Sequence, residues 1–443
     1  MNVLHIMQCT ELGGMEQAAY GLMDRMLKGG RIGFKVVTPQ QFGLGRARLA
    51  PLDPDAADCE YRGRFGWRSQ RRFRRLVSAR ATDCSAIWVT GASVASLTAV
   101  MRSPLPKILS HHHHHFEGRG SWWRWRAFYE LFGHRLDAVV FPTAFTRDEA
   151  VSIAPWLKSR THVIRNGVTL QETLPSDRLA ARRLLDLPER ALIIGNGGWL
   201  IARKRFDIFL QVAARVKAVL PEAVFVICGD GPLRPELEEM ATALGLADCV
   251  RFEGWTSDMT PYYKAFDIAL FNSDHDAFGR TPLEAASHGA IVVASVLHGG
   301  LSEFIQHERN GFLWPRHEVG KMAEAIIRVG SGDGAERIRQ SAFASIRRDY
   351  DIARAAAEYA ELFSTLTGQT RSMAPAGAMP FGERHDRYQS PRTAHRVGLT
   401  NTFGRPVSLF AMAARIARRR MVITSIRRRR SGFDARLPGE SGR

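Results

Sequence analysis

The regular return of short apolar runs between longer helical patterns constrains the fold more than any other feature of this sequence. The first part of the chain contains NVLHIM, FKVVT, AIWVT, KILS and DAVVF, and the second contains ALIIGNG, AVFVICG, VRFEG, DIALF and AIVVAS. Strands that are apolar throughout are buried on both faces, as in parallel sheets covered by helices. The sequence therefore predicts an α/β protein with two doubly wound parallel sheets.

The chain is long enough for two separate cores, since it has 443 residues, 45% of them hydrophobic. We place the first domain at residues 1–168 and the second at residues 169–350. The Asn166–Gly167 turn is followed by a loss of periodicity over residues 168–188, which we interpret as a hinge. Residues 351–367 read as a helix that we expect to return to the first domain, and residues 368–443 as an Arg-rich linker and tail.

The positive charge is concentrated in the tail. The formal net charge is +18, and residues 371–443 carry 16 arginines, no lysine and 4 acids, a net +12. Residues 405–430 can form a helix with an apolar side and a side crowded with arginine, which is typical of an anionic membrane surface. Nucleic acid and an Arg-rich disordered extension without a partner remain the alternatives for the tail.

Cysteine usage and hydropathy bear on the compartment. The five cysteines are scattered without a CxxC pair, which favours a reducing environment and no structural zinc. The start, MNVLHIMQCTELGG, reads as a buried strand and not as a signal peptide. No stretch reaches the roughly 18 apolar residues needed to span a bilayer. We expect a cytoplasmic protein, either soluble or attached to the inner face of a membrane.

The stretch DAFGRTPLE places two carboxylates, Asp276 and Glu284, eight positions apart. Thr281, Pro282 and Glu284 have the form of a capping box at a helix start. A helix N-terminus next to Gly279 suits a phosphate, because its amides and partial positive charge attract anions. Glu284 could accept hydrogen bonds from sugar hydroxyls, or it could only cap its own helix.

A second stretch, GNGGWLIARKRFDIFL, follows the first apolar run of the second domain. Its paired glycines, Gly197 and Gly198, let backbone amides approach a diphosphate, and Lys204 adds a compact charge just before a helix that opens at Phe206. Arg-Lys runs are usually solvated surfaces. However, the carboxyl end of a strand is where open α/β sheets bind ligands.

The first apolar run of the chain ends at a third glycine turn, Gly13–Gly14. The spacing is not GxGxxG, so a nicotinamide dinucleotide fingerprint is absent. The turn could be only a tight connection. If the two domains dock edge to edge, this turn and Gly197–Gly198 would face each other across a cleft.

Three further stretches of the first domain stand out: the histidine run 111–115, YRGRFGWRSQRRFRRL from Tyr61 and SWWRWRAFY from Ser121. Histidines on a strand alternate between faces and cannot converge on one metal ion, so one or two of them could sit at the cleft. Periodicity does not say which ones. The two basic, aromatic stretches could contact bases or lipid headgroups, or could be solvated helices.

In their order along the chain, these motifs resemble glycosyltransferase family 4. The resemblance rests on Gly13–Gly14, RNGV at 165–168, RKRFDIFL, CGDGPLRPELEEMATALGLADCVRFEGW, DAFGRTPLEAASHGAIVVAS and GGLSEFIQHERNGFLW. It covers about residues 1–365 and does not extend to the tail. It implies the GT-B fold, in which two Rossmann-like domains face a cleft, with the sugar donor in the second and the acceptor in the first.

The resemblance also implies roles for individual residues. Lys204 would hold the donor diphosphate with help from Arg203 or Arg205, while Asp276 would lie near the transferred sugar and Glu284 near the ribose. A histidine after the fourth or fifth strand of the first domain would approach the sugar, for which we favour His112 and then His113. The remaining donor contacts would come from the two glycine turns and from the start of the helix: Gly13, Gly14, Gly198, Phe278, Gly279, Arg280 and Thr281.

The expected function is therefore that of a retaining, metal-independent hexosyltransferase. It would use a nucleoside diphosphate sugar, without a cofactor, and a glycan or lipid-linked acceptor in cell-envelope or exopolysaccharide synthesis. Three residues depart from the family pattern: Asp276 replaces a glutamate, Trp199 an arginine and Arg205 a glycine. The alternatives are a sugar-nucleotide-binding protein without catalysis and a nucleic-acid-binding protein that uses the Arg clusters, although nucleic acid is not the partner we expect.

Overall fold

The computed structural model describes residues 1–368, except for residues 9, 11–12, 31, 44, 62–66, 113–118, 172–173, 175–176, 297 and 333. The side chains of residues 60, 61, 119 and 298 are also not described. The predicted linker and the basic helix at 405–430 lie outside these residues. Within the described part, no helix is long and apolar enough to cross a membrane.

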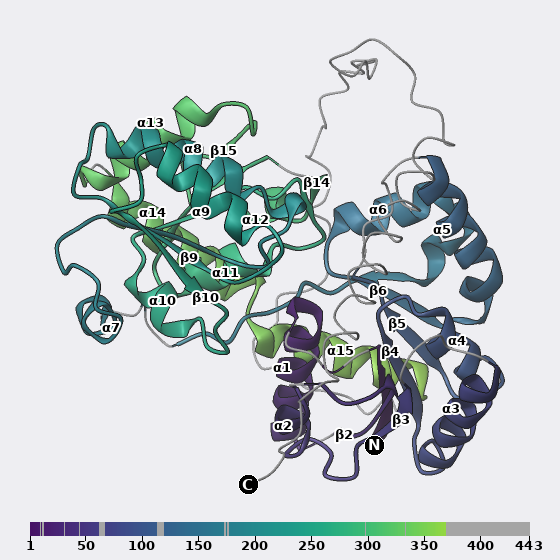
Figure 1. The fold of residues 1–443 in the computed structure, drawn as a ribbon. Coiled ribbons are helices and arrows are strands. Elements are labelled where there is room, and N and C mark those ends of the chain that lie inside the picture. Colours follow the sequence, from purple (N-terminus) through teal and green to yellow (C-terminus); the bar gives the residue numbers. More distant parts are fainter. Residues whose placement is uncertain are drawn as a thin grey trace, which may run out of the picture. The chain divides into compact units, whose positions relative to one another are not determined.

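The first sheet has seven parallel strands in the order β3-β2-β1-β4-β5-β6-β7 (Figure 1). The order reverses at β1, so helices cover both faces, as in a doubly wound fold. The strands are β1 (Asn2–Met7), β2 (Gly33–Gln40), β3 (Ala57–Tyr61), β4 (Ala86–Thr90), β5 (Lys107–Ser110), β6 (Ala138–Phe141) and β7 (Thr161–Val163). The helices are α1 (Gly14–Lys28), α2 (Arg46–Leu49), α3 (Trp67–Arg80), α4 (Val94–Val100), α5 (Arg119–Phe132) and α6 (Ala144–Ile153), with 3₁₀ turns η1 (Gly133–Arg135) and η2 (Pro155–Arg160).

The second sheet has six parallel strands in the order β10-β9-β8-β11-β13-β15. The strands are β8 (Ile193–Gly197), β9 (Val224–Cys228), β10 (Val250–Gly254), β11 (Ile268–Phe271), β13 (Ile291–Ser295) and β15 (Phe312–Trp314). A separate pair joins β12 (His275–Asp276) to β14 (His298–Gly299). The helices are α7 (Arg178–Leu184), η3 (Ala202–Lys204), α8 (Phe206–Lys217), α9 (Arg234–Ala243), α10 (Thr260–Ala265), α11 (Arg280–Ser287), α12 (Leu301–Phe304), α13 (Val319–Gly330), α14 (Ala335–Asp349) and α15 (Ile352–Leu366).

The predicted fold class is confirmed, and the ten apolar runs are all strands of these two sheets. Three further strands, β3, β7 and β15, were not predicted from the apolar runs. Each lies at the edge of its sheet. Edge strands are short and partly exposed, so they do not need the continuous apolar sequence that marks an inner strand.

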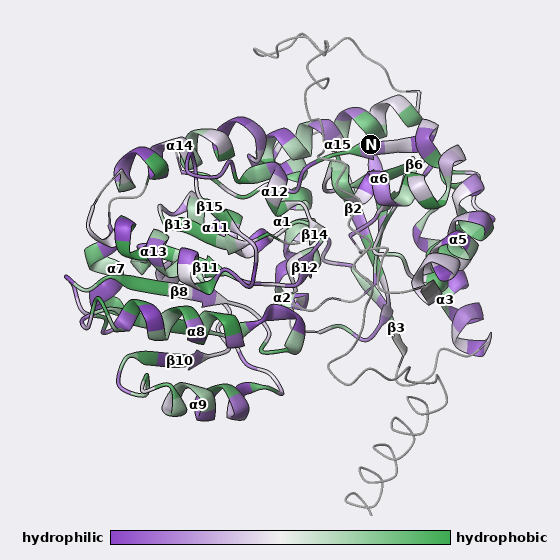
Figure 2. Ribbon diagram, turned by 90° about the horizontal axis from the view of Figure 1, so that it is seen from above, coloured by the Kyte–Doolittle hydropathy of each residue, from purple (hydrophilic) through white to green (hydrophobic). Residues whose placement is uncertain are grey.

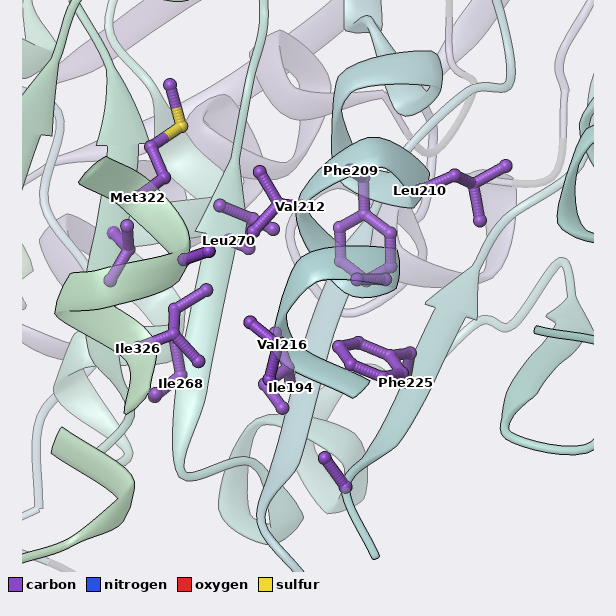
Figure 3. Close-up of a cluster of buried hydrophobic side chains, with 14 of the residues drawn as sticks. Ile194, Phe209, Leu210, Val212, Val216, Phe225, Ile268, Leu270, Met322 and Ile326 are labelled. Carbon is purple, nitrogen blue, oxygen red and sulfur yellow. The ribbon is translucent and has the colours of Figure 1, made fainter. Parts of the chain in front are cut away.

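Buried side chains fill the space between each sheet and its helices. In the second domain, Phe209 and Val216 of α8 and Ile326 of α13 pack on strand residues such as Ile194 and Leu270 (Figure 3). All of these side chains are fully or almost fully buried. The green colour of β8 and β11 in Figure 2 marks the same apolar strands. This packing fixes the carboxyl ends of the strands, from which the loops discussed below emerge.

The chain passes between the two sheets twice, at neighbouring places. Val168 pairs with Asp351, and the Ile352 amide donates to the Val168 carbonyl at 3.1 Å. A Cβ atom on Gly167 would lie 2.2 Å from the Cα of Ile352, so only glycine permits this approach. After this crossing, α15 packs on the first sheet, and Tyr359 hydrogen bonds with Ser110 at 2.7 Å.

The predicted loss of periodicity over residues 168–188 is wrong for its last part, which contains α7. The helical periodicity of apolar residues could not be recognised in this segment, because one of the buried positions of α7 is an arginine. Arg182 is 4% exposed and donates to the carbonyls of Ala265 and Glu189 and to the carboxylate of Asp267. A buried, fully bonded charge looks like a surface residue in a hydropathy pattern.

Candidate functional site

A cavity of about 710 Å³ is lined by loops that follow the strands of both sheets. The predicted site residues that line it are Gly13, Gly14, His112, Gly198, Arg203, Lys204, Asp276, Phe278, Arg280, Thr281 and Glu284. Among the described residues that were predicted for the site, Gly279 and Arg205 are not in the lining, although the Gly279 amide contacts Asp276. Residues that are distant in the sequence therefore meet at one place.

The first domain contributes mainly uncharged groups to this cavity. Gly13 precedes α1, and a Cβ on Gly14 would lie 4.0 Å from the Cδ of Arg280 in the second domain. Of the histidine run, His112 lines the cavity. His111 is buried instead, with its ring centroid 4.7 Å from that of Trp125 and 5.3 Å from that of Phe141. His113 lies outside the described residues.

The second domain contributes the charges, beginning with the turn η3. Lys204 donates to Asp276 Oδ2 at 2.9 Å and lies 5.0 Å from the ring centroid of Phe271. Arg203 donates to the His275 carbonyl at 2.9 Å and has its Nη1 atom 3.8 Å from Asp276 Oδ2. Two cations thus share one carboxylate, which leaves this part of the cavity with a net positive charge.

Asp276 is held in its ionised form. Its side chain is 23% exposed. Burial acts to raise its pKa, but Lys204, Arg203 and the amide of Gly279 outweigh burial and hold the pKa below the ordinary value. Asp276 also belongs to β12, where it pairs with Gly299. A carboxylate fixed by a strand, two hydrogen-bond donors and a nearby guanidinium is positioned before any ligand arrives.

Arg205 is one of the three departures from the family pattern, and the structure gives its local setting. It has φ 51°, in the left-handed region, and precedes α8. Glycine adopts this conformation without strain, whereas other residues lose roughly 1–2 kcal/mol. Arg205 is retained here with ion pairs to Asp207 at 2.7 Å and Asp274 at 3.2 Å. The predicted helix start at Phe206 is confirmed.

The capping box predicted at Thr281 is wrong. The helix α11 begins one residue earlier, at Arg280, and its N-cap is Gly279 with φ 84° and no side-chain cap. Gly279 can turn the chain left-handed into the helix, so Thr281 already lies inside the first turn. The predicted end is confirmed, because Gly289 has φ 91° and Ala290 donates to the Ala285 carbonyl, as in a Schellman motif.

Glu284 therefore does not cap its own helix. Its Oε1 atom accepts from Arg280 one turn earlier, and its Oε2 atom accepts from the Tyr263 hydroxyl at 3.1 Å. Burial, and then the charge of Glu284, raise the pKa of Tyr263 well above its ordinary value, so this hydroxyl remains a donor. A carboxylate has about four acceptor positions, so Glu284 keeps capacity for a ligand hydroxyl.

Several residues that line the cavity were not predicted. The loop after β10 contributes residues 255–260, with Trp255 52% exposed. The rule that ligands bind at the carboxyl ends of strands could have indicated this loop. Tyr263, His288, Arg48 and Asn166 also line the cavity. Asn166 and His288 lie in the RNGV and DAFGRTPLEAASHGAIVVAS stretches, which could have indicated them. No sequence signal marks Arg48 or Tyr263, because each reaches the cavity through packing of its own element.

Trp199, another departure from the family pattern, lies on the cavity and is 63% exposed. An indole cannot provide the charge of an arginine. The positive charges next to Trp199 therefore come from Arg203 and Lys204, which follow it by four and five residues along the chain. Among the residues that the structure describes, no three His, Cys, Asp or Glu side chains gather as a metal site.

Two family models match the chain, one on each domain. Residues 12–172 match the model described as Glycosyltransferase Family 4, and residues 189–331 match the model described as Glycosyl transferases group 1. The two matches together include the glycine turn of the first domain, η3 and α11. The order of motifs that indicated the family is thus recovered in two independent halves.

Curated relatives carry glycosyltransferase names. The chain is 28% identical over 255 residues to the D-inositol 3-phosphate glycosyltransferase of Thermobispora bispora, and this match covers 55% of this chain and 59% of that protein. It is 31% identical over 181 residues to the lipopolysaccharide core biosynthesis glycosyltransferase LpsE of Rhizobium meliloti, and this match covers 41% of this chain and 50% of that protein. The chain spans about half the length of the curated relatives it matches.

Solved structures agree on the fold. HepE of Anabaena in complex with UDP-glucose superposes with a TM-score of 0.71 at 22% identity, over 82% of this chain and all of that chain. The lipopolysaccharide outer core galactosyltransferase WaaB superposes with a TM-score of 0.62 at 17% identity over 82% of this chain. A glycosyltransferase family model matches each of the two domains, so the chain belongs to the family 4, group 1 glycosyltransferases.

Proposed function

We propose that this protein is a retaining glycosyltransferase that transfers a hexose from a nucleoside diphosphate sugar to a glycan or lipid-linked acceptor. The observation that carries the proposal is the joint lining of one cavity by Lys204, Asp276 and the start of α11. The bound UDP-glucose of HepE makes UDP-sugars the first donors to test. Envelope or exopolysaccharide synthesis at the inner face of a membrane is the proposed setting, with the basic tail as a proposed membrane contact.

The proposed role of the second domain is to hold the donor diphosphate. Negative charge grows on the leaving phosphate as the bond to the sugar breaks. Lys204 and Arg203 lie beside it in this proposal. The start of α11 adds the positive end of the helix dipole and the backbone amides around Phe278, Gly279, Arg280 and Thr281. These groups would supply the charge that a metal ion provides in other transferases, so the proposed reaction needs no metal.

The two carboxylates take different parts in the proposal. Asp276 lies beside Lys204 and would orient the transferred sugar. Glu284 is fixed by Arg280 and Tyr263 and would accept a hydrogen bond from the ribose. Gly13 and Gly14 would close over the phosphates from the first domain, and Gly198 would let the backbone approach them. His112 would contact the sugar from the same side as the acceptor, whose proton passes to the leaving phosphate.

A donor screen tests the proposal directly. The melting temperature of the full chain is measured with UDP-, GDP-, ADP- and dTDP-sugars, because a ligand that binds only the folded state raises it. We expect one nucleotide class to raise the melting temperature, with and without EDTA. A shift that disappears in EDTA would contradict metal independence, and no shift with any donor would contradict the donor site.

Catalysis needs a separate measurement, because a protein could bind the donor without transferring the sugar. Asp276 and Trp199, which depart from the family pattern, give that second possibility its basis. Slow hydrolysis of the bound donor, followed by NMR, is expected for an active enzyme, and the anomer released first reports retention. Donor binding without any hydrolysis or transfer would favour the catalytically degenerate protein.

A further inference from the structure

The helices on one face of the first sheet carry exposed apolar side chains among arginines. Helices α3, α4 and α5 cover the same face, since Phe73, Leu97 and Phe128 belong to one buried cluster with its strands. Figure 1 shows α4 between α3 and α5. In a parallel sheet the helices that follow strands begin at the carboxyl edge, so all three start on the edge from which His112 emerges.

The apolar part of this face follows α5. Trp123, Ala127 and Leu131 are spaced by four residues, which places them along one line of the helix. All three are exposed, Trp123 by 68% and Leu131 by 62%. Trp67 at the start of α3 is 70% exposed, and Val94 at the start of α4 is 57% exposed. Large apolar side chains this exposed are often interaction sites when they gather on one face.

The basic part of this face follows α3. This helix contains six arginines and no acid over Trp67–Arg80. Arg80 pairs with Asp53, and Gln70 of the same helix donates to the Ala95 carbonyl of α4 at 2.9 Å. The arginines on the outer side of α3 are exposed, and α5 adds one more near its start: Arg68, Arg71, Arg72, Arg75 and Arg124.

We propose that this α3–α5 face, made of Trp67, Val94, Trp123, Leu131 and these five arginines, docks on an anionic lipid surface. Arginine binds phosphate headgroups, while tryptophan and leucine insert at the level of the acyl boundary. A nucleic acid would use the arginines but would not require the apolar line of Trp123, Ala127 and Leu131. The face is separate from the donor cavity, so docking does not depend on catalysis.

Docking of this face would also orient the molecule. His112 and the Gly13–Gly14 turn emerge from the same edge of the sheet at which the three helices begin. The first-domain side of the cavity would then lie next to the headgroups. This orientation rests on the proposed function, because it gives a lipid-linked acceptor a short path from the bilayer to the cavity.

Tryptophan fluorescence can separate this face from the tail, because residues 369–443 contain no tryptophan. The full chain is mixed with vesicles of phosphatidylcholine alone, or with added phosphatidylglycerol, whose acyl chains carry bromine as a quencher. We expect quenching with the anionic vesicles only. We expect it to fall by half or more in the Trp67→Ser, Trp123→Ser double variant and to persist in Leu184→Ser, a control on α7 that is 73% exposed.

The arginines are tested by the variant Arg68→Gln, Arg71→Gln, Arg75→Gln. Each basic residue near an anionic surface adds to binding, so we expect this variant to bind the anionic vesicles at least about tenfold more weakly, judged by quenching. The matched control is Arg190→Gln, Arg309→Gln, Arg337→Gln, three exposed arginines of the second domain. It should change binding less than about twofold.

Three outcomes would overturn the proposal. The first is vesicle binding without tryptophan quenching, which would assign the contact to the tail. The second is equal quenching in the double tryptophan variant and the wild type. The third is binding of a single-stranded oligonucleotide, lost in the α3 arginine variant, by a protein that ignores anionic vesicles. Donor binding in lipid-free buffer is recorded in parallel, so a failed donor site is recognised independently.

Discussion

Two helix starts in the second domain, those of α8 and α11, solve the same geometric problem with different residues. Each is preceded by one residue in the left-handed conformation, Arg205 with φ 51° and Gly279 with φ 84°. The glycine needs no further support. The arginine depends on two carboxylates, Asp207 and Asp274. The same left-handed backbone conformation is therefore reached either with no side chain at that position or with a side chain held by ion pairs.

The two starts are also connected to each other. Lys204 binds Asp276, Arg203 binds the His275 carbonyl, and the Asp274 amide donates to the Arg203 carbonyl at 2.9 Å. The cations of one loop and the acid of the other therefore form one unit. A substitution at one helix start should therefore change the contacts of the other.

The largest effect is expected from Lys204→Ala. Removal of one preorganised charge contact typically lowers the turnover number about 100-fold or more. The same substitution also removes the closest cation from Asp276. Steady-state kinetics with the donor found in the screen measures the loss. Lys217→Ala is the matched control, because Lys217 also pairs with an aspartate, Asp248, but does not line the cavity. Near wild-type turnover in Lys204→Ala would refute the diphosphate assignment.

The next effect concerns the glycine start. Gly279→Ala should lower the free energy of unfolding by about 1–2 kcal/mol, because alanine is strained at a left-handed φ. A new Cβ would meet Leu301 and Pro282 at 3.5 Å, so space does not add to this loss. Urea unfolding measures it. The control Gly320→Ala lies inside α13, where alanine is preferred, and should have the opposite sign. Equal effects at both positions would contradict the backbone argument.

A smaller effect separates strain from ion pairing at the arginine start. Arg205→Ala and Arg205→Gly both lose the contacts with Asp207 and Asp274, but only glycine relieves the left-handed strain. The glycine variant should therefore be more stable than the alanine variant, by about 1 kcal/mol or less, since glycine also loosens the unfolded chain. Thermal unfolding compares them. An alanine variant as stable as the glycine variant would show that φ 51° is not strained here.

The smallest effect is a pH dependence that originates at Asp276. Its pKa is lower in the folded protein than the ordinary value of 3.8. Its ion pairs therefore contribute fully above pH 3.8, and the contribution is lost as the pH falls through the lower, folded pKa. Asp276→Asn should destabilise the protein near neutral pH, and the difference from the wild type should shrink below pH 3.8 in unfolding experiments. A difference that does not change with pH would contradict this origin.

The candidate site was predictable where its residues lie at the ends of apolar strands. Gly198 follows β8 directly, and Gly13 and Lys204 lie in the loops after β1 and β8. Their position at the carboxyl edge therefore follows from the strand pattern. The contacts of Glu284 were not predictable, because the sequence of this stretch is compatible both with a capping box and with the observed pairing of Glu284 with Arg280 and Tyr263. The structure shows that the left-handed Gly279 is the N-cap, so the helix begins at Arg280 and Glu284 is not a capping residue.

The two parallel sheets, their ten apolar strands and the motifs that identify the family can be read from the amino-acid order, because burial on both faces of a strand requires a continuous apolar run. Features that depend on a neighbouring element appear only once the chain is folded. The edge strands β3, β7 and β15 exist because an inner strand offers them hydrogen bonds, and α7 is helical around a buried Arg182 because Asp267 and two carbonyls bind it. His111 and His112 are adjacent residues of the same type, and their different positions follow from packing: His111 is buried in the core, and His112 lines the cavity.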